Sequence, residues 1–346
     1  MNIGMVMVMI NNFLIKIMLL SLSASIIATI LFAIKPLVKV RLTKTWQYYI
    51  WLVVVLRMLI PYTPEQSLMG GLYNFIDSNS QVLSTANNIE ITGTLGVISN
   101  YIGLGWLSIV ALLLLKKIIS YHVYVRFIKT NRLPITDIGV IQIYDEVCRD
   151  MEISKEIGLY SYRMTNSPML IGFFKPYIVL PETMLKKTDS LKYVILHEMA
   201  HYKRKDFIYK WLIQIVSCVH FFNPIIFLIR DIVSKDCELS CDETVIRKLD
   251  NHSKKAYGSA LINSLESDTK YKQPTAVSLM LCEDIEQIKD RLDAILHYKQ
   301  STNIIMSVTF ILTGFICFST IYVGVFKNIF SSCYCHYIED FIKSFM

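Results

Sequence analysis

His197-Glu198-Met199-Ala200-His201 lies within residues 191–210, a stretch in which apolar residues return at spacings of three and four and Pro and Gly are absent. This periodicity predicts a helix. Residues four apart project from one face of a helix, so the two imidazoles can hold one Zn²⁺ between them. The glutamate beside the first histidine can take a proton from a water molecule that the metal activates. We therefore interpret His197 and His201 as zinc ligands and Glu198 as a general base.

A catalytic zinc ion usually has three protein ligands and keeps its fourth position for water, so a third ligand must come from elsewhere. The best candidate is Glu238, in a second predicted helix over residues 231–248. Asp242 lies four residues later on the same face and is predicted to orient a ligand histidine. An ordinary solvated acidic face is the competing interpretation. Cys237 and Cys241 are also four apart, but two thiolates would fill the coordination shell, so we interpret both as small buried apolar residues.

The composition describes a membrane protein. Of 346 residues, 53% are hydrophobic and only 18% are charged. Crossing about 30 Å of hydrocarbon takes roughly 20 helical residues. Four segments are predicted to do so, at residues 17–34, 46–60, 95–115 and 304–326. The net charge of +7 then reflects the excess of Lys and Arg in cytoplasmic loops, and direct nucleic-acid binding is not predicted.

Positive charge sets the predicted orientation, because cytoplasmic loops carry the excess of Lys and Arg. Four such residues, at positions 35, 39, 41 and 44, follow the first segment, whereas residues 63–96 contain none. A cleaved signal peptide carries its charge before the apolar run, so the first segment is predicted to be an uncleaved anchor. The expected organisation is a membrane region with three spans over residues 1–117, a cytoplasmic domain over 118–303, a fourth span over 304–326 and a short outer tail over 327–346.

The cytoplasmic block is large enough to form a domain with its own core. Short strands are predicted at residues 140–144, 169–173 and 177–180, and further helices at 255–265 and 283–296.

Residues 207–229 are apolar enough for a fifth span. A full crossing, however, would put His201 and Glu238 on opposite sides of the hydrocarbon. We therefore predict a bent or re-entrant helix pair that begins and ends on one side, with its break at Asn223-Pro224.

Other residues are weaker candidates. His220 lies on an apolar face, where a core histidine is a more common outcome than a catalytic one. Asp206 is expected either to support the zinc helix or to form a salt bridge. The basic run over residues 202–205 is interpreted as an interfacial or solvated surface. Cys333 and Cys335 are expected to be unpaired thiols on the outside, with a disulfide from one of them to another chain as the open alternative.

The order of these motifs resembles the integral-membrane zinc peptidases of the BlaR/MecR type, which are penicillin-sensing antirepressors. The likeness is carried by His197-Glu198-x-x-His201, Asp206, Asn223-Pro224 and Glu238-x-x-x-Asp242, and by residues 167–181, S-P-M-L-I-G-F-F-K-P-Y-I-V-L-P. It implies a mainly α membrane protein with a cytoplasmic α+β, gluzincin-like zinc peptidase domain. It also implies that His197, His201 and Glu238 bind zinc, that Glu198 is the general base, and that the substrate is a cytoplasmic transcriptional repressor.

The resemblance has one large departure. The best-known members of that family carry an extracytoplasmic penicillin-binding domain after the last membrane helix, whereas about 20 residues follow position 326 here, without a serine-x-x-lysine acylation motif. A partner sensor or a different stimulus is therefore expected.

We expect a multi-pass zinc endopeptidase of the bacterial cytoplasmic membrane that acts on a protein substrate held along an edge strand near residues 169–173. Two alternatives stay open. One is a zinc protease of the membrane quality-control or prenyl-protein type, which shares both zinc motifs. The other is a non-enzymatic membrane receptor or adaptor stabilised by zinc. Three predicted spans ahead of the metal helix favour the antirepressor type over the first, and Glu198 argues against the second because a structural site needs no general base.

Overall fold

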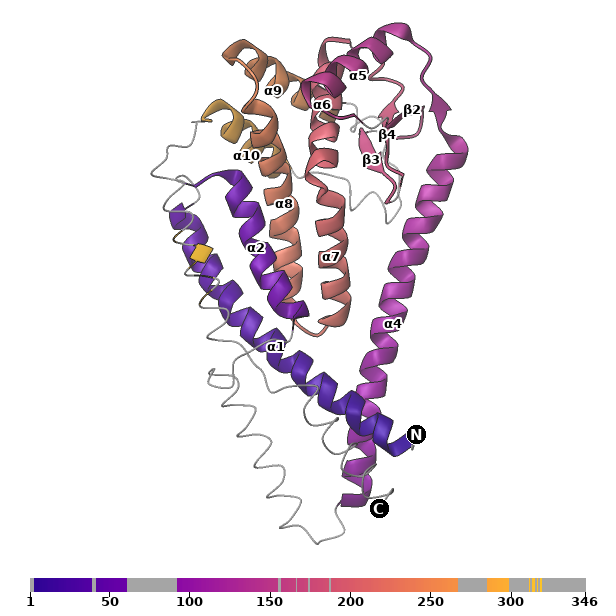
Figure 1. Ribbon diagram of the computed structural model, residues 1–346, viewed down its shortest axis with the longest axis vertical. Helices are drawn as coiled ribbons and strands as arrows, with labels where there is room; N and C mark the ends of the chain where they lie inside the picture. The colour runs from indigo at the N-terminus through magenta and orange to yellow at the C-terminus, as the bar shows by residue number, and fades with distance from the viewer. Residues whose placement is uncertain are drawn as a thin grey trace, which may run out of the picture.

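The computed structural model describes residues 3–38, 42–60, 92–154, 157–165, 167–173, 175–186, 188–266 and 285–298, with isolated positions between 311 and 318. Most of these residues are helical. Long helices run into a compact group of shorter helices and a small sheet at one end of the molecule (Figure 1). The expected tail over residues 327–346, with both outer cysteines, lies outside the described residues, and the expected fourth span is described only at isolated positions.

The N-terminal region contains the helices α1 (Ile3–Val38), α2 (Lys44–Leu59) and α4 (Thr92–Asn131). By length and composition, Phe13–Pro36 within α1 and Tyr101–Asn131 within α4 could each cross a membrane. Helix α2 has 16 residues and is therefore about 24 Å long, which is less than the hydrocarbon thickness. The prediction of a span at residues 46–60 is thus not confirmed.

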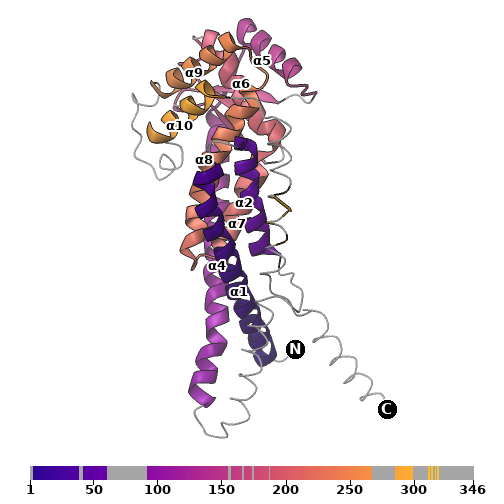
Figure 2. The ribbon, with the colours of Figure 1, turned by 90° about the vertical axis from the view of Figure 1, so that its left-hand side faces the viewer.

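Helices α7 (Asp206–Val219) and α8 (Pro224–Ile246) form an antiparallel hairpin beside α2 (Figures 1 and 2). The break predicted at Asn223-Pro224 is confirmed. The Asn223 side chain accepts a hydrogen bond from the backbone of Ile225, and Pro224 occupies the first turn, where a missing N–H has no cost. Because the hairpin reverses, its two open ends lie together.

Buried polar contacts join the N-terminal helices to α8. Lys35 of α1 donates to both carboxylate oxygens of Asp236, at 2.8 and 2.7 Å, and the Trp51 indole of α2 donates to the same group at 3.1 Å. The backbone and hydroxyl of Thr45 donate to Glu243 at 2.8 and 2.7 Å. One apolar core fills the space among α1, α2, α7 and α8, so these helices form a single bundle.

The four-stranded sheet has the order β1-β2-β4-β3, with β1 at Leu133–Pro134, β2 at Gly158–Tyr162, β3 at Met169–Ile171 and β4 at Tyr177–Pro181. Only β2 and β4 are parallel. Strands β3 and β4 confirm the strands predicted at residues 169–173 and 177–180. Gly172 turns the chain between them with a φ of +104°, and a Cβ there would lie 2.5 Å from the carbonyl oxygen of Lys175.

The strand predicted at residues 140–144 is wrong, because this segment lies within helix α5 (Ile138–Asp150). The Asp137 side chain caps the helix by accepting from the backbone of Gly139 and Val140. Val140 and Val147 are both buried, and their spacing of seven keeps them on one helical face. The cap and this period outweigh the β-propensity of the apolar run.

The single helix predicted over residues 191–210 is divided in the structure. Helix α6 (Thr188–Arg204) ends before Lys205, whose φ of 57° is left-handed, and α7 begins at Asp206. The helices predicted near residues 255–265 and 283–296 are confirmed as α9 (Asn251–Glu266) and α10 (Ile285–Leu296). A second apolar core joins α5, α6, α9, α10 and the end of α8.

The C-terminal end of α4 packs on the sheet. The Arg132 guanidinium lies over the rings of Tyr160 and Tyr177, at 3.5 and 4.1 Å from their centroids. The Tyr124 hydroxyl lies 3.0 Å from the sulfur of Met169 in β3. A long apolar helix is therefore attached directly to the sheet.

Candidate metal centre

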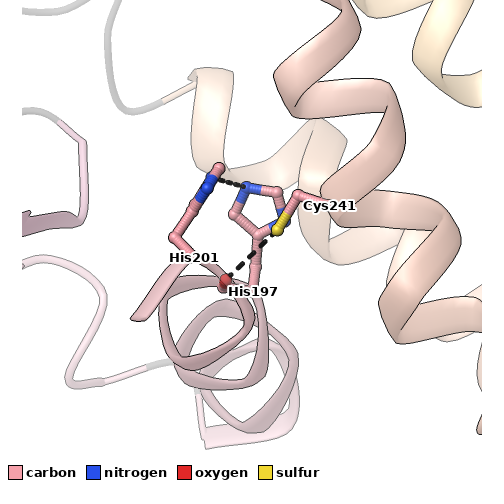
Figure 3. A group of neighbouring side chains, drawn as sticks. All are labelled: His197, His201 and Cys241. Atoms are coloured by element: carbon pink, nitrogen blue, oxygen red, sulfur yellow. Dashed lines mark hydrogen bonds between the residues drawn. The ribbon is translucent and has the colours of Figure 1, made fainter. Parts of the chain in front are cut away.

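Helix α6 brings the two predicted histidine ligands together. The Nε2 atoms of His197 and His201 are 3.2 Å apart, and Figure 3 shows both rings on one side of α6, with the His197 ring between His201 and Cys241 of α8. The spacing of four residues explains this arrangement, because such residues share one helical face. Both side chains are largely buried, with 13% and 11% of their surface exposed.

Glu238 of α8 completes a triangle with these nitrogens. Its Oε2 atom lies 3.2 Å from Nε2 of His197 and 3.4 Å from Nε2 of His201. Tetrahedral zinc ligands bound at about 2.0–2.1 Å stand about 3.3 Å from one another. The three predicted ligand atoms therefore have the mutual separations of three corners of a zinc tetrahedron.

Asp206 orients His201. The Nδ1 atom of His201 is 2.7 Å from Oδ2 of Asp206, and because a carboxylate only accepts, Nδ1 carries the proton. The other carboxylate oxygen accepts from the Tyr48 hydroxyl at 3.2 Å and lies 3.3 Å from the Arg204 guanidinium. Asp206 thus contacts a histidine of the metal helix and also forms a salt bridge, so the two interpretations that the sequence left open do not exclude each other.

A different network orients His197. The Tyr257 hydroxyl of α9 donates to Asp242 at 2.5 Å, so its oxygen accepts from Nδ1 of His197 at 2.8 Å. Asp242 itself lies 3.3 Å from that nitrogen and binds Arg291 of α10 through two hydrogen bonds of 2.7 and 2.9 Å. In both histidines Nδ1 is therefore a donor, which leaves the Nε2 lone pairs facing the space beside Glu238.

The charges around the centre favour a cation. Burial would raise the pKa of Glu238, but the opposing charges, that of His201 foremost, hold it well below its ordinary value. Burial likewise opposes ionisation of Asp242, yet Arg291 lowers its pKa. Burial also disfavours protonation of the two histidines, but the carboxylates around them, Asp242 beside His197 and Glu238 and Asp206 beside His201, help to raise their pKa values well above the ordinary one. The groups around the centre thus stabilise positive charge between the Nε2 atoms of the two histidines.

Cys237 and Cys241 are fully buried, as predicted. The Cys241 sulfur lies beside the His197 ring (Figure 3) and donates to the His197 carbonyl at 3.5 Å. Its sulfur and a donor atom of each histidine lie within 4.8 Å of one another, and the same holds for Cys237 with His201 and Asp206. Both thiols therefore border the centre, beside the Glu238 carboxylate that lies 3.2 and 3.4 Å from the two Nε2 atoms.

The remaining candidates lie in different settings. Glu198 is buried next to His197, with 7% exposed. His220 lies in the turn between α7 and α8, at the opposite end of α7 from Asp206, where it contacts the Met58 carbonyl at 3.2 Å. The basic run over residues 202–205 is not a uniform surface, because the Arg204 side chain is only 9% exposed.

Sequence reasoning missed several residues of the centre. Tyr257 and Arg291 support His197 through Asp242, Tyr48 contacts Asp206, and the Lys210 ammonium lies 3.5 Å from Glu238. The position of Lys210, four residues after Asp206 in an apolar helix, was a signal that could have been used. The other three lie on helices distant in sequence, and no local pattern marks them.

Comparison with known proteins agrees with this arrangement. The family described as BlaR1 peptidase M56 matches residues 15–295. The regulatory protein BlaR1 of Bacillus licheniformis is 23% identical over 319 residues, which cover 84% of this chain and 52% of the relative. A methicillin resistance mecR1 protein of Staphylococcus aureus is 24% identical over 311 residues, with the same coverage. This chain thus spans about half the length of these relatives. Because the family match covers most of its residues, including the whole candidate centre, the chain belongs to the BlaR1 peptidase M56 family.

Proposed function

We propose that this protein is a zinc endopeptidase in which His197, His201 and Glu238 hold the metal and Glu198 is the general base. The observation that carries the proposal is the triangle of two Nε2 atoms and one carboxylate oxygen, with sides of 3.2, 3.2 and 3.4 Å. Membership of a peptidase family supports the same conclusion.

The donor set favours zinc. Two imidazoles and one carboxylate, with a fourth position left for water, are typical of catalytic zinc, whereas Mg²⁺ and Ca²⁺ prefer oxygen ligands. Glu238 is a better third ligand than Cys241, whose thiol donates to a backbone carbonyl. We assign Asp206 and Asp242 to the orientation of the two ligand histidines.

When bound, zinc supplies the Lewis acidity that polarises a scissile carbonyl and lowers the pKa of water. Glu198 takes the proton from the attacking water and passes it to the leaving amine. Its burial shields the carboxylate from bulk solvent, so the proton stays in the site between the two transfers.

Strand β3 is the proposed substrate-binding element. It lies at the edge of the described sheet and packs near α6, which carries His197 and Glu198. An extended peptide could pair with this edge through main-chain hydrogen bonds. Main-chain pairing is largely independent of the amino-acid sequence of the peptide. Contacts with the side chains of the peptide would therefore set substrate specificity.

We place this centre in a multi-pass protein of the bacterial cytoplasmic membrane. The membrane region over residues 1–117 would anchor a cytoplasmic domain over 118–303, followed by another span over 304–326. Helices α1 and α4, both able to cross a bilayer by length and composition, support this arrangement. The names of the relatives, a regulatory protein and a methicillin resistance protein, favour a signalling role. The proposed substrate is a cytoplasmic regulator such as a transcriptional repressor, with a partner sensor supplying the signal.

The test compares full-length wild-type protein with Glu198→Gln in detergent micelles. Zinc is measured by elemental analysis, and cleavage is measured by mass spectrometry on a peptide mixture from a bacterial proteome. We expect about one zinc per chain in both proteins and at least a hundredfold slower cleavage in the variant. The control His197→Ala should lose both metal and cleavage. Undiminished cleavage by Glu198→Gln, or a wild-type protein without zinc, would reject the proposal.

A further inference from the structure

Helix α2 reaches the candidate metal centre through one side chain. Tyr48 is fully buried, and its hydroxyl donates to Oδ1 of Asp206 at 3.2 Å. The second oxygen of Asp206 accepts from Nδ1 of His201 at 2.7 Å. A continuous path of two hydrogen bonds therefore runs from the N-terminal bundle to a proposed metal ligand, across 158 residues of sequence.

We propose that Tyr48 is a positioning residue of the metal centre, which α2 thereby helps to build. This inference rests on the proposed function, because it assigns His201 to the metal. Tyr48 acts through Asp206 and touches neither metal nor substrate.

The need for this hydroxyl follows from the burial of Asp206. Its side chain is only 3% exposed, and a buried carboxylate is costly unless its oxygens are hydrogen-bonded. One oxygen is committed to His201, and the other has Tyr48 and Arg204. Without the hydroxyl, the carboxylate can turn toward the guanidinium, which weakens its hold on the imidazole.

The surroundings of Tyr48 fix where its hydroxyl points. The ring packs against Tyr209, with centroids 5.0 Å apart, and the Arg204 guanidinium lies 5.0 Å from its centroid. Three residues earlier, Thr45 binds Glu243 of α8 through two hydrogen bonds. Helix α2 is therefore attached to the elements that carry Asp206 and Glu238, so the position of α2 and the geometry of the ligands are coupled.

Tyr209 provides a matched control. It is buried in the same core, and within the described part of the chain its hydroxyl has no hydrogen-bond partner. Both Tyr48→Phe and Tyr209→Phe remove one buried oxygen, but only the first removes a contact with Asp206.

The experiment measures zinc affinity of the full-length proteins by competition with a chromophoric chelator, and the visible absorption of their Co²⁺ forms. Tyr48→Phe should weaken zinc binding about three- to tenfold, less than the ten- to hundredfold typical of groups that touch a ligand directly, and should shift the Co²⁺ bands. Tyr209→Phe should match the wild type. In an Asp206→Asn background, Tyr48→Phe should have no further effect, because the two residues act in series.

Three outcomes would overturn the inference. They are wild-type affinity in Tyr48→Phe, an equal loss in Tyr209→Phe, and simple additivity of Tyr48→Phe with Asp206→Asn. In each of these the wild type still binds zinc, so the proposed function stands. A wild-type protein that binds no zinc would instead remove both proposals.

Discussion

The two proposed histidine ligands lie one helical turn apart, yet they are oriented by different parts of the molecule. His201 depends on Asp206, at the start of α7, and through it on Tyr48 of the N-terminal bundle. His197 depends on Tyr257 and Asp242, and through them on Arg291 near the end of the described chain. The centre therefore has one support from the N-terminal bundle and a second, the domain-side support, from α8, α9 and α10.

Because each imidazole has its own support, α6 and α8 alone do not define the geometry of the centre. A fragment restricted to residues 188–246 would contain every proposed ligand but would lack Tyr48, Tyr257 and Arg291. The orientation of each imidazole needs a helix from outside that fragment.

The largest effect should come from removing a ligand itself, because neither support can replace a lost bond to the metal. Glu238→Ala and His197→Ala should each lower zinc affinity on the order of a thousandfold, because each removes one of three protein bonds. Equilibrium dialysis against zinc would measure this loss. Cys241→Ala is the control and should retain the metal. Full zinc binding by Glu238→Ala, or loss of zinc in Cys241→Ala, would move the third ligand to the thiol.

The next effect separates the two supports. Asp206→Asn and Asp242→Asn should each weaken zinc binding about ten- to hundredfold, because each disturbs the partner of a ligand histidine. In metal-free protein, Asp242→Asn should unfold at a lower temperature than Asp206→Asn. It breaks a buried ion pair with Arg291 that has hydrogen bonds of 2.7 and 2.9 Å and whose loss costs about 3–5 kcal/mol, whereas the Arg204 guanidinium stands farther from Asp206, at 3.3 Å. Thermal unfolding in excess chelator would compare them. Equal melting temperatures would contradict the view that the domain-side support is the more strongly ionic.

A smaller effect is expected within the domain-side support. Tyr257→Phe removes the hydroxyl between His197 and Asp242, but it leaves the carboxylate 3.3 Å from the imidazole nitrogen. Zinc affinity should fall about tenfold, at the lower limit for a group that contacts a ligand. Tyr193→Phe, on the neighbouring ring 6.2 Å away, is the matched control. We expect the loss of zinc affinity to be larger in Tyr257→Phe than in Tyr48→Phe. The opposite order would contradict this prediction.

The smallest effect is expected at Lys205, the residue with left-handed backbone conformation between α6 and α7. Lys205→Gly should change the free energy of unfolding by less than about 0.5 kcal/mol, because relief of strain offsets the added freedom of the unfolded chain. Lys205→Val should destabilise by about 1–2 kcal/mol, since a β-branched residue is strained at positive φ. Thermal unfolding of the pair measures the difference. An unaffected Lys205→Val protein would mean that this turn does not fix the approach of Asp206 to His201.

The sequence was informative where one helix or one turn decides the outcome. The four-residue spacings of His197 with His201 and of Glu238 with Asp242 predicted which side chains share a face, and Asn223-Pro224 predicted the hairpin. The left-handed conformation of Lys205 was not predicted, because apolar residues keep their helical spacing on both sides of it. The segment at residues 140–144 was misassigned because β-branched residues also occur in capped helices.

Contacts between distant helices could not be predicted. Tyr48 and Tyr257 are ordinary partly polar core residues, whereas an arginine such as Arg291 is expected at the surface. Only the packing of α2, α9 and α10 gives these side chains their partners, and nothing in the local sequence marks them.

The attachment of α4 to the sheet has a consequence for measuring motion. Arg132 is held over two tyrosine rings, and Tyr124 contacts β3, so α4 and the edge strand should move as one rigid body. The helix has 40 residues and is about 60 Å long, so a small tilt at one end becomes a large displacement at the other. A spin label at the exposed Leu112 would therefore report, from the apolar region, on the orientation of the strand beside the metal helix.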